Sequence, residues 1–381
     1  MINRIINGIE IEINPLEADA IYLSEKDIAN LKEFDIESII YYILSKNDAK
    51  YIPLSMTIEL TNKCNYNCPF CYIHDNDSKG SYGNFYRFED IKMDLLWLID
   101  HGLLYCTITG GEPLLHPDFK EIYLFMKNNG VLINLFTNLS LLNDEILDLI
   151  LTYPPLKLET TMYAYNDPQY SLITNQTAFS AKDFKARVLM LKDKGINVIC
   201  KTPLNSSTIN EFEKCKKWCD ENKVAYYYSE NVSNSYNGID MQAYKLNYDV
   251  ILKIKKSRVV EIPKQDFFNF GKKQAFECGA GKCAFFISYD YCLRPCMSFY
   301  EIKDANFKIK YNEIHEAFNQ MLDFINFYKN KPLTFCCGCT SKKICKVCVI
   351  DEIKYIQKGY DYRIKCNENS RILAEILDDK F

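Results

Sequence analysis

The chain has 381 residues, of which 48% are hydrophobic and 25% are charged, a globular composition that excludes a mainly disordered protein. Its 46 basic and 50 acidic residues give a net charge of −4, which provides no electrostatic footprint for nucleic acid or for an anionic membrane. The sequence contains no run of about 18 apolar residues, the length needed to cross a bilayer. Glu10, Glu12 and Glu17 lie where a signal peptide needs an apolar stretch. We therefore expect a cytoplasmic protein without nucleic-acid or membrane partners.

The first 50 residues predict a small α+β element. Residues 9–13 (IEIEI) alternate as a half-buried strand does, and Ser24 is suited to cap a helix that begins at residue 25.

Strand-like and helix-like segments alternate over residues 51–235. Helix-like segments, three of them followed by a C-capping glycine (Gly102, Gly130 and Gly195), separate six β-branched or aromatic runs. The predicted strands are 54–60, 105–110, 131–137, 157–163, 197–203 and 225–232, and the predicted helices are 88–102, 118–130, 143–153, 181–195 and 209–222. The pattern predicts an α/β fold with parallel strands, either a partial (β/α)6 TIM-like barrel or a doubly wound open sheet. Both arrangements bind ligands at the carboxyl ends of the strands.

The cysteines are unevenly placed. Of the 17, three lie between residues 64 and 71 and ten between residues 278 and 366. Free thiols in a reducing compartment are inert, catalytic or metal-bound, so this clustering predicts two thiolate-rich metal centres. Because the βα rhythm stops near residue 240, we expect residues 236–381 to be an irregular Cys-rich module that metal stabilises. The scattered Cys106, Cys200, Cys215 and Cys219 are expected to be buried apolar thiols.

The first cluster has the spacing C-x3-C-x2-C, at Cys64, Cys68 and Cys71. Three thiolates on one loop suit a soft metal centre with one position left open, such as a 4Fe–4S cluster. The alternative is a Cys3His zinc loop with His74 as the fourth ligand.

With Phe70 inside the motif and Tyr72 after it, this loop resembles that of the radical S-adenosylmethionine (SAM) superfamily. Gly110-Gly111-Glu112-Pro113, after the second strand, resembles the GGEP motif of that family, which receives the SAM amino group. Two glycines allow a close backbone approach, and Glu112 offers an anionic acceptor. The resemblance implies that SAM is bound by Phe70, Tyr72, Gly110, Gly111, Glu112, Pro113, Thr137, Asn138, Thr160, Thr161 and Lys201. For Thr160, Thr161 and Lys201, local hydrogen bonding at strand ends is the alternative.

The family's reaction is what the resemblance implies for function. A reduced cluster donates an electron to SAM, and the resulting 5′-deoxyadenosyl radical removes a hydrogen atom from the substrate. The protein positions the reactants and excludes water. An external one-electron reductant, flavodoxin-like or ferredoxin-like, would supply the electron.

The second cysteine field resembles the SPASM extension of radical SAM enzymes, which carries two auxiliary 4Fe–4S clusters. Position by position, the resemblance implies that Cys278, Cys283, Cys296 and Cys348 hold one cluster and that Cys336, Cys339, Cys345 and Cys366 hold the other. Two residues separate Cys345 from Cys348 where the family usually has three, and Cys292 and Cys337 are further candidates. A zinc ribbon of two CxxC pairs is the alternative.

The segment that begins Thr161-Met-Tyr-Ala-Tyr resembles the corresponding region of SPASM peptide maturases. This resemblance implies a ribosomally made precursor peptide as the substrate and a thioether or carbon–carbon cross-link as the product. Residues 1–50 are then either a shortened leader-binding domain or a cap over the barrel bottom. A peptide epimerase, a small-molecule enzyme and a non-catalytic zinc protein remain alternatives. Met297 stands where sulfatase maturases carry an Asp, which disfavours that chemistry.

Overall fold

The computed structural model describes the chain in several stretches. These are residues 1–18, 21–29, 31, 38–39, 42–43, 51–73, 85–230, 232–236, 238–259, 279–329, 350 and 353.

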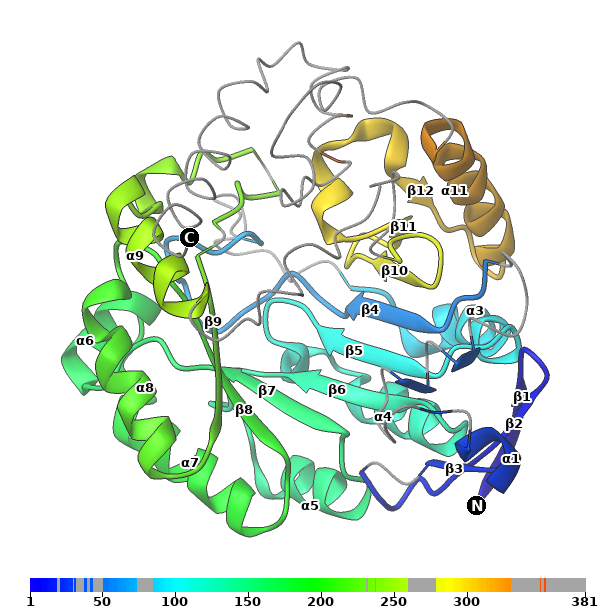
Figure 1. The fold of residues 1–381 in the computed structure, drawn as a ribbon, viewed down its shortest axis with the longest axis horizontal. Coiled ribbons are helices and arrows are strands. Elements are labelled where there is room, and N and C mark those ends of the chain that lie inside the picture. Colours follow the sequence, from blue (N-terminus) through cyan, green and yellow to red (C-terminus); the bar gives the residue numbers. More distant parts are fainter. Residues whose placement is uncertain are drawn as a thin grey trace.

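A sheet of nine strands forms the centre of the molecule (Figure 1). Six parallel strands lie side by side in sequence order: β4 (Ser55–Glu59), β5 (Tyr105–Thr109), β6 (Leu132–Phe136), β7 (Lys157–Thr161), β8 (Val198–Pro203) and β9 (Ala225–Ser229). A doubly wound sheet would reverse its strand order near the middle, so that alternative is wrong. The α/β class and the mostly parallel sheet are confirmed, and the unreversed order is consistent with a partial barrel.

Helices connect these strands as the sequence predicts. The five predicted helices are α3 (Phe88–Asp100), α4 (Phe119–Asn128), α5 (Asp144–Thr152), α7 (Ala181–Asp193) and α8 (Phe212–Glu221). The three predicted capping glycines adopt positive φ angles, as a helix C-terminus requires. The sequence analysis missed the short helix α6 (Asp167–Thr174), which begins with an Asn166 cap and a proline in its first turn. Further helical segments are η2 (Pro113–Leu115), η3 (Ile209–Glu211), η4 (Gln242–Tyr244) and α9 (Tyr248–Val259).

The two faces of the parallel sheet differ in chemistry. Residues such as Met56, Ile58 and Cys106 pack with the helices in one apolar core. The alternate residues point to the opposite side, which we call the lumen face. Strand pairing places the lumen-face residues in register: Glu59 with Thr109, Thr107 with Asn134, Phe136 with Glu159, and Thr161 with Lys201. The lumen face is therefore largely polar.

The C-terminal part of the sheet was not predicted. Strand β10 (Ala284–Ile287) pairs in parallel with β4, and β11 (Cys292–Arg294) and β12 (Phe307–Lys308) continue the sheet antiparallel. Two short helices, η5 (Met297–Glu301) and η6 (Lys303–Ala305), and the long helix α11 (Ile314–Lys329) follow. The expectation of an irregular module is thus wrong for residues 284–329, because these segments extend the barrel's own sheet and its helix-side core.

The N-terminal residues form a separate antiparallel sheet of β1 (Ile2–Ile6), β2 (Ile9–Ile13) and β3 (Ile21–Leu23). The short helix α1 (Glu25–Ile28) follows, and its Asp27 amide donates to the predicted Ser24 cap. The apolar side of this sheet packs on Leu54, Leu104, Leu132 and Leu156, which lie at the starts of β4 to β7. Figure 1 shows the sheet beside those strand starts. The N-terminal sheet therefore covers the amino ends of these strands, and whether it also binds a leader peptide stays a prediction.

Arg4 joins this cap to the barrel. Its guanidinium donates to the carbonyls of Leu103 (2.6 Å), Ile99 (2.6 Å) and Gly130 (3.2 Å), which follow or end helices α3 and α4. A cation at helix C-termini satisfies carbonyls that have no partner within the helix. Burial lowers the pKa of Arg4 to about 10, and the side chain remains charged at neutral pH.

We expect Arg4→Ala to lower the free energy of unfolding by about 2–4 kcal/mol, because several partly buried carbonyls lose a charged donor. Urea unfolding of the metal-free protein, followed by circular dichroism, measures this change. Glu10→Ala, at an exposed position in the same small sheet, is the control and should change stability by less than about 0.5 kcal/mol. Equal stability of the two variants would contradict a stabilising role for the hydrogen bonds of Arg4.

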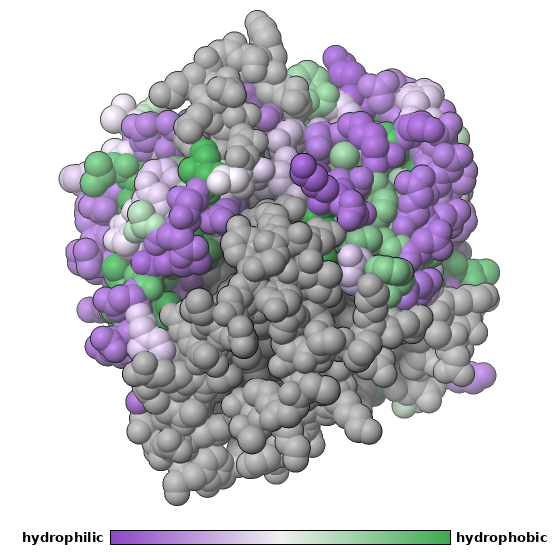
Figure 2. Space-filling view, turned by 90° about the horizontal axis from the view of Figure 1, so that it is seen from above, coloured by the Kyte–Doolittle hydropathy of each residue, from purple (hydrophilic) through white to green (hydrophobic). Residues whose placement is uncertain are grey.

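The face of the molecule that Figure 2 shows has no large hydrophobic patch in its described part. On the face shown in Figure 2, hydrophilic residues predominate in the described part and hydrophobic residues are scattered among them. No helix among the described residues has both the length and the apolar character needed to cross a membrane.

Candidate active site

The first cysteine cluster lies on the loop that leaves the carboxyl end of β4. Cys68 is buried, Cys64 and Cys71 are half-buried, and all three are free thiols. Burial raises the pKa of Cys64 to about 12 and, with a smaller effect of the Glu112 charge, keeps its proton on. Burial also raises the pKa of Cys68, and the nearby Cys71 and Cys64 raise it further. The Cys71 amide donates to the Cys68 carbonyl at 3.1 Å, which places these two cysteines in one turn of the loop.

The GGEP segment lies directly against this loop. The Gly111 amide donates to the Thr61 carbonyl and the Glu112 amide donates to the Lys63 carbonyl, both at 2.8 Å. A Cβ atom on Gly110 would lie 2.6 Å from the Thr61 carbonyl oxygen, and one on Gly111 would lie 2.6 Å from the Lys63 carbonyl carbon. The glycines are thus required for a close approach to the cysteine loop, a contact that the sequence analysis had assigned to the ligand.

Glu112 joins the ends of β5 and β6. One carboxylate oxygen accepts from the Thr137 hydroxyl (2.8 Å) and the Leu114 amide (3.2 Å), and the other accepts from the Asn138 amide (2.7 Å). The side chain is fully buried, and burial raises its pKa to about 7 against the lowering effect of these hydrogen bonds. Its predicted role toward the SAM ammonium stays a prediction, beside this observed role in holding the strand ends together.

Asn138 extends the contact back to the cysteine loop. Its side-chain amide donates to Asn65 Oδ1 at 2.9 Å and lies 3.9 Å from Cys64 Sγ. The cysteine loop, the GGEP turn and the end of β6 are therefore one interlocked unit at the carboxyl edge of the sheet. Pro113 begins helix η2 within this unit.

The two aromatic residues of the motif point to different neighbours. The Phe70 ring packs on Tyr163 and Tyr244, at 6.3 and 6.0 Å between centroids. The Tyr72 ring packs on Tyr236 at 5.1 Å, and the Tyr236 amide donates to the Tyr72 carbonyl. Tyr72 thus ties the cysteine loop to the segment after β9.

The remaining predicted SAM contacts are divided between the two faces of the sheet. Thr161 and Lys201 share the lumen face, and Lys201 pairs with Glu159 and lies 4.2 Å from the Phe136 ring centre. Thr160 pairs in register with Cys200 and belongs to the helix side, where its buried hydroxyl has no hydrogen-bond partner among the described residues. The structure brings Thr161, but not Thr160, to the lumen with Lys201.

An aromatic cluster that the sequence analysis missed surrounds the cysteine loop. Tyr66, Tyr163 and Tyr170 pack edge-to-face at 6.0–6.3 Å, and the Tyr66 and Tyr170 hydroxyls lie 3.3 Å apart. Such apolar walls lower the local dielectric around a redox centre. Tyr163 and Tyr170 lie in the segment after β7, which was considered only for its family resemblance. The tyrosines of that segment were the signal from which the aromatic cluster could have been predicted.

Two of the predicted auxiliary-cluster ligands, Cys283 and Cys296, lie in the described residues. The Gly281 amide donates to the Pro295 carbonyl at 3.1 Å, which brings the turn before Cys283 to the turn that holds Cys296. Cys292 is buried in β11, and its sulfur lies 4.0 Å from the Asp290 carbonyl oxygen. The other cysteines of this field, and His74, lie outside the described residues: Cys278, Cys336, Cys337, Cys339, Cys345, Cys348 and Cys366. Cys106, Cys200, Cys215 and Cys219 are buried as predicted.

The donor set of the first loop fits an iron–sulfur cluster. Three thiols outside any disulfide share one loop, aromatic rings surround it, and metal binding would replace the protons that burial holds on the sulfurs. No three Cys, His, Asp or Glu side chains of the described residues are arranged to hold a single metal ion.

We expect Glu112→Gln to weaken SAM binding by about 5- to 100-fold, the cost of one lost charged hydrogen bond. Both carboxylate oxygens accept backbone amides, so a glutamine must turn its NH2 group toward a donor. The dissociation constant, measured by anaerobic equilibrium dialysis, checks this. Glu145→Gln, an exposed change on α5, is the control, and equal affinity in both variants would contradict the expectation.

Comparison with known proteins agrees with this site. Residues 58–219 match the family model described as the Radical SAM superfamily. The chain is 25% identical over 260 residues to the antilisterial bacteriocin subtilosin biosynthesis protein AlbA of Bacillus subtilis, covering 65% of this chain and 56% of AlbA. It is 27% identical over 169 residues to the sporulation killing factor maturation protein SkfB of Bacillus subtilis, covering 44% of this chain and 40% of SkfB. The chain thus spans about half the length of these curated relatives.

The fold is similar to that of a solved structure. Streptococcus suis SuiB superposes with a TM-score of 0.60 at 15% identity, covering 93% of this chain and 95% of SuiB. SuiB bound to precursor peptide SuiA gives a TM-score of 0.56, covering 86% of this chain and 83% of SuiB. Residues 58–219, which include the interlocked cysteine loop and GGEP turn, thus match the model of the Radical SAM superfamily.

Proposed function

We propose that this chain is a radical SAM enzyme that modifies a ribosomally made precursor peptide, forming a thioether or carbon–carbon cross-link. SAM, bound beside a reduced cluster, would supply the radical chemistry that removes a hydrogen atom from the peptide. The observation that carries the proposal is the interlocked unit at the carboxyl ends of β4, β5 and β6, where the loop that carries three thiols is hydrogen-bonded to the GGEP turn.

The peptide substrate is supported by the relatives. AlbA and SkfB are named for the biosynthesis of a bacteriocin and the maturation of a killing factor, and SuiB was solved with its precursor peptide. A polar lumen face that includes Glu59, Thr109 and Thr161 offers hydrogen-bonding groups to a peptide that enters the barrel.

The residues of this chain have separate tasks in the proposed reaction. Cys64, Cys68 and Cys71 would hold a 4Fe–4S cluster, which supplies the electron that cleaves the sulfonium. Gly110 and Gly111 hold the SAM-binding turn against the cysteine loop, and Glu112 fixes that turn to β6. Fixed placement of this kind lowers the entropy cost of reaction and excludes water.

Two auxiliary 4Fe–4S clusters in the second cysteine field remain part of the proposal. The apposition of the turns at Gly281 and Pro295 supports a shared centre for Cys283 and Cys296. An external one-electron reductant, flavodoxin-like or ferredoxin-like, would serve all the clusters.

Anaerobic reconstitution and mass spectrometry test the proposed function. About twelve iron atoms per chain and SAM-dependent release of 5′-deoxyadenosine are expected, on the three-cluster count. Each short open reading frame next to this gene is co-expressed with it, and the masses of the encoded peptides are measured. A cross-link lowers the mass of the modified peptide by that of two hydrogen atoms. An unchanged mass with inverted residues indicates an epimerase. Stoichiometric zinc without sulfide overturns the proposal.

A further inference from the structure

A second buried carboxyl group faces the lumen, next to the predicted SAM site. Glu59 is the last residue of β4 and is fully buried. Its neighbours in the strand, Ile58 and Leu60, belong to the helix-side core, and its register partner is Thr109 on the lumen face. The carboxyl group therefore points to the side where a substrate of the barrel would lie.

Tyrosines surround this carboxyl group. The Tyr236 hydroxyl donates to Glu59 Oε1 at 2.7 Å, and the Tyr86 hydroxyl donates to the Glu59 carbonyl at 2.7 Å. The Tyr236 ring stacks on Tyr300 at 3.5 Å and 8°, which fixes the donating hydroxyl. Glu59 Oε2 is buried and has no hydrogen-bond partner among the described residues. One oxygen is thus held in place by Tyr236, while no hydrogen bond within the described residues fixes the other.

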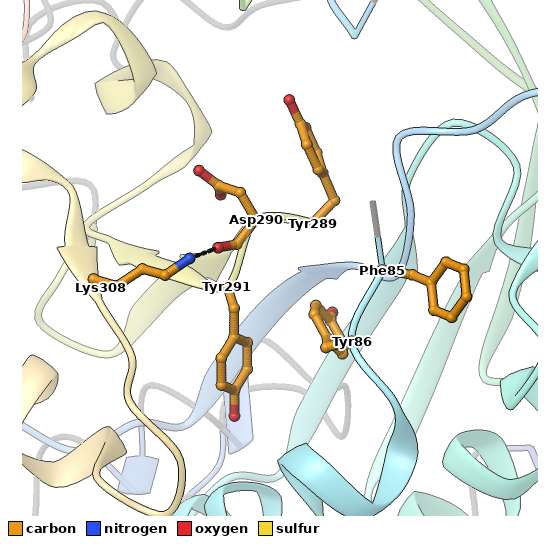
Figure 3. A pocket seen from close by; sticks show the side chains of 6 residues that line it. All are labelled: Phe85, Tyr86, Tyr289, Asp290, Tyr291 and Lys308. Carbon is orange, nitrogen blue, oxygen red and sulfur yellow. Dashed lines mark hydrogen bonds between the residues drawn. The ribbon is translucent and has the colours of Figure 1, made fainter. Parts of the chain in front are cut away.

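A pocket adjoins one of these tyrosines, Tyr86. It has a volume of about 340 Å³ and is lined by Phe85, Tyr86, Tyr289, Asp290, Tyr291 and Lys308 (Figure 3). Tyr86 and Tyr289 both line this pocket and lie next to Glu59. Figure 3 shows Tyr289 and Tyr291 pointing in opposite directions from their loop, while the Lys308 amine reaches the Asp290 carbonyl. The pocket gives a peptide side chain a place to approach the Glu59 region.

Several segments of the chain place polar or charged groups next to Glu59. Burial raises the pKa of Glu59 to about 7, opposed by the Tyr236 hydroxyl, the Arg294 charge, the Tyr289 amide and the Tyr72 hydroxyl. Arg294 is itself shared with Asp290, at 3.5 Å. A carboxyl group that titrates near neutral pH can both take and release a proton under working conditions.

We propose that Glu59 is the proton acceptor for a cysteine thiol of the substrate peptide. In this step the S–H bond breaks, its electron pair stays on sulfur, and the proton forms an O–H bond with Oε2. The step needs no oxidant, and it rests on the proposed function, since a thioether cross-link requires the thiol to lose its proton. An unperturbed thiol has a pKa near 8.5, and this value is close enough to the pKa of Glu59 for efficient proton transfer.

Glu59→Gln tests the proton acceptor, with Asp94→Asn as a matched control. Asp94 is a buried carboxyl on α3 that also accepts from a tyrosine, Tyr291 at 2.6 Å, but on the helix side. We expect Glu59→Gln to keep its iron and to lose at least about 100-fold in peptide product. Asp94→Asn should keep both its iron and its product formation. Wild-type product formation by Glu59→Gln overturns the proposal.

The pH profile distinguishes proton transfer from a structural effect. Product formation by the wild type should rise with pH and reach half its maximum near 7, the sign expected when the ionised carboxylate is active. Tyr236→Phe removes the donor to Oε1 and should move this midpoint to higher pH, which remains measurable if Glu59→Gln does not fold. An unmoved midpoint in Tyr236→Phe overturns the proposal. A wild-type enzyme that modifies no peptide refutes the proposed function itself, a result distinct from either variant outcome.

Discussion

Replacing Cys64, Cys68 or Cys71 by alanine is expected to abolish reductive cleavage of SAM, because each replacement removes one of three thiolates that a 4Fe–4S cluster needs. Iron content should fall by about four atoms per chain relative to the wild type. Anaerobic iron analysis and chromatography of 5′-deoxyadenosine measure both effects. The fold should survive, since the loop is tied by backbone hydrogen bonds to the GGEP turn that need no metal.

Cys106→Ala is the control for this experiment. Cys106 is a fully buried thiol on the helix side of β5, where it lies in register with Met56 of β4. Its replacement leaves a small cavity that costs about 1–2 kcal/mol, and both iron content and SAM cleavage should remain. SAM cleavage at the wild-type rate in any variant of the three loop cysteines would remove the assignment.

Gly111→Ala is expected to reduce SAM cleavage by more than about 100-fold, although it adds only one methyl group. The new Cβ would lie 2.6 Å from the Lys63 carbonyl carbon and 2.8 Å from the Asn62 carbonyl oxygen. These are backbone atoms of the cysteine loop and cannot rotate away as a side chain could. The loop must therefore shift, and the hydrogen bonds at Thr61 and Lys63 are lost.

A second glycine separates this effect from general strain. Gly195 has a φ angle of +84°, and a methyl group added there would meet no atom within 4 Å beyond its chain neighbours. Gly195→Ala therefore introduces backbone strain without a steric conflict. It should lower stability by about 1 kcal/mol and leave SAM cleavage unchanged. If Gly111→Ala behaved in the same way, with normal iron content and cleavage, the close approach would have no functional importance.

Sequence reasoning worked best where local patterns repeat. The six strands and five helices were predicted because the strands are β-branched or aromatic runs and three of the helices end at a capping glycine, Gly102, Gly130 or Gly195. Strand β10 was missed although its residues Ala284–Ile287 are apolar, because a run of four residues is too short to identify a strand. It becomes a strand by pairing with β4, more than 200 positions earlier in the chain, and no local signal records that pairing.

The site shows the same division between residue identity and geometry. The motif residues Cys64, Gly111 and Glu112 were predicted, but the orientation of each side chain was not. Thr160 and Thr161 are adjacent in sequence and chemically identical, yet the pleat sends them to opposite faces, so only Thr161 reaches the lumen. Glu59 was passed over because a single carboxylate at a strand end has no motif, and its raised pKa arises only from burial among tyrosines.

By itself, the amino-acid sequence determined the parallel α/β architecture and the three-thiol loop, because these depend on residue periodicity and on spacing along the chain, whereas the pairing of that loop with a GGEP turn came from the family resemblance. Only the tertiary structure decided that the glycines touch the cysteine loop, that the N-terminal sheet covers the barrel bottom and that a carboxyl group is buried in the lumen. The reason is physical: close packing and desolvation act between residues far apart in sequence, and their strength depends on distances that no local pattern encodes.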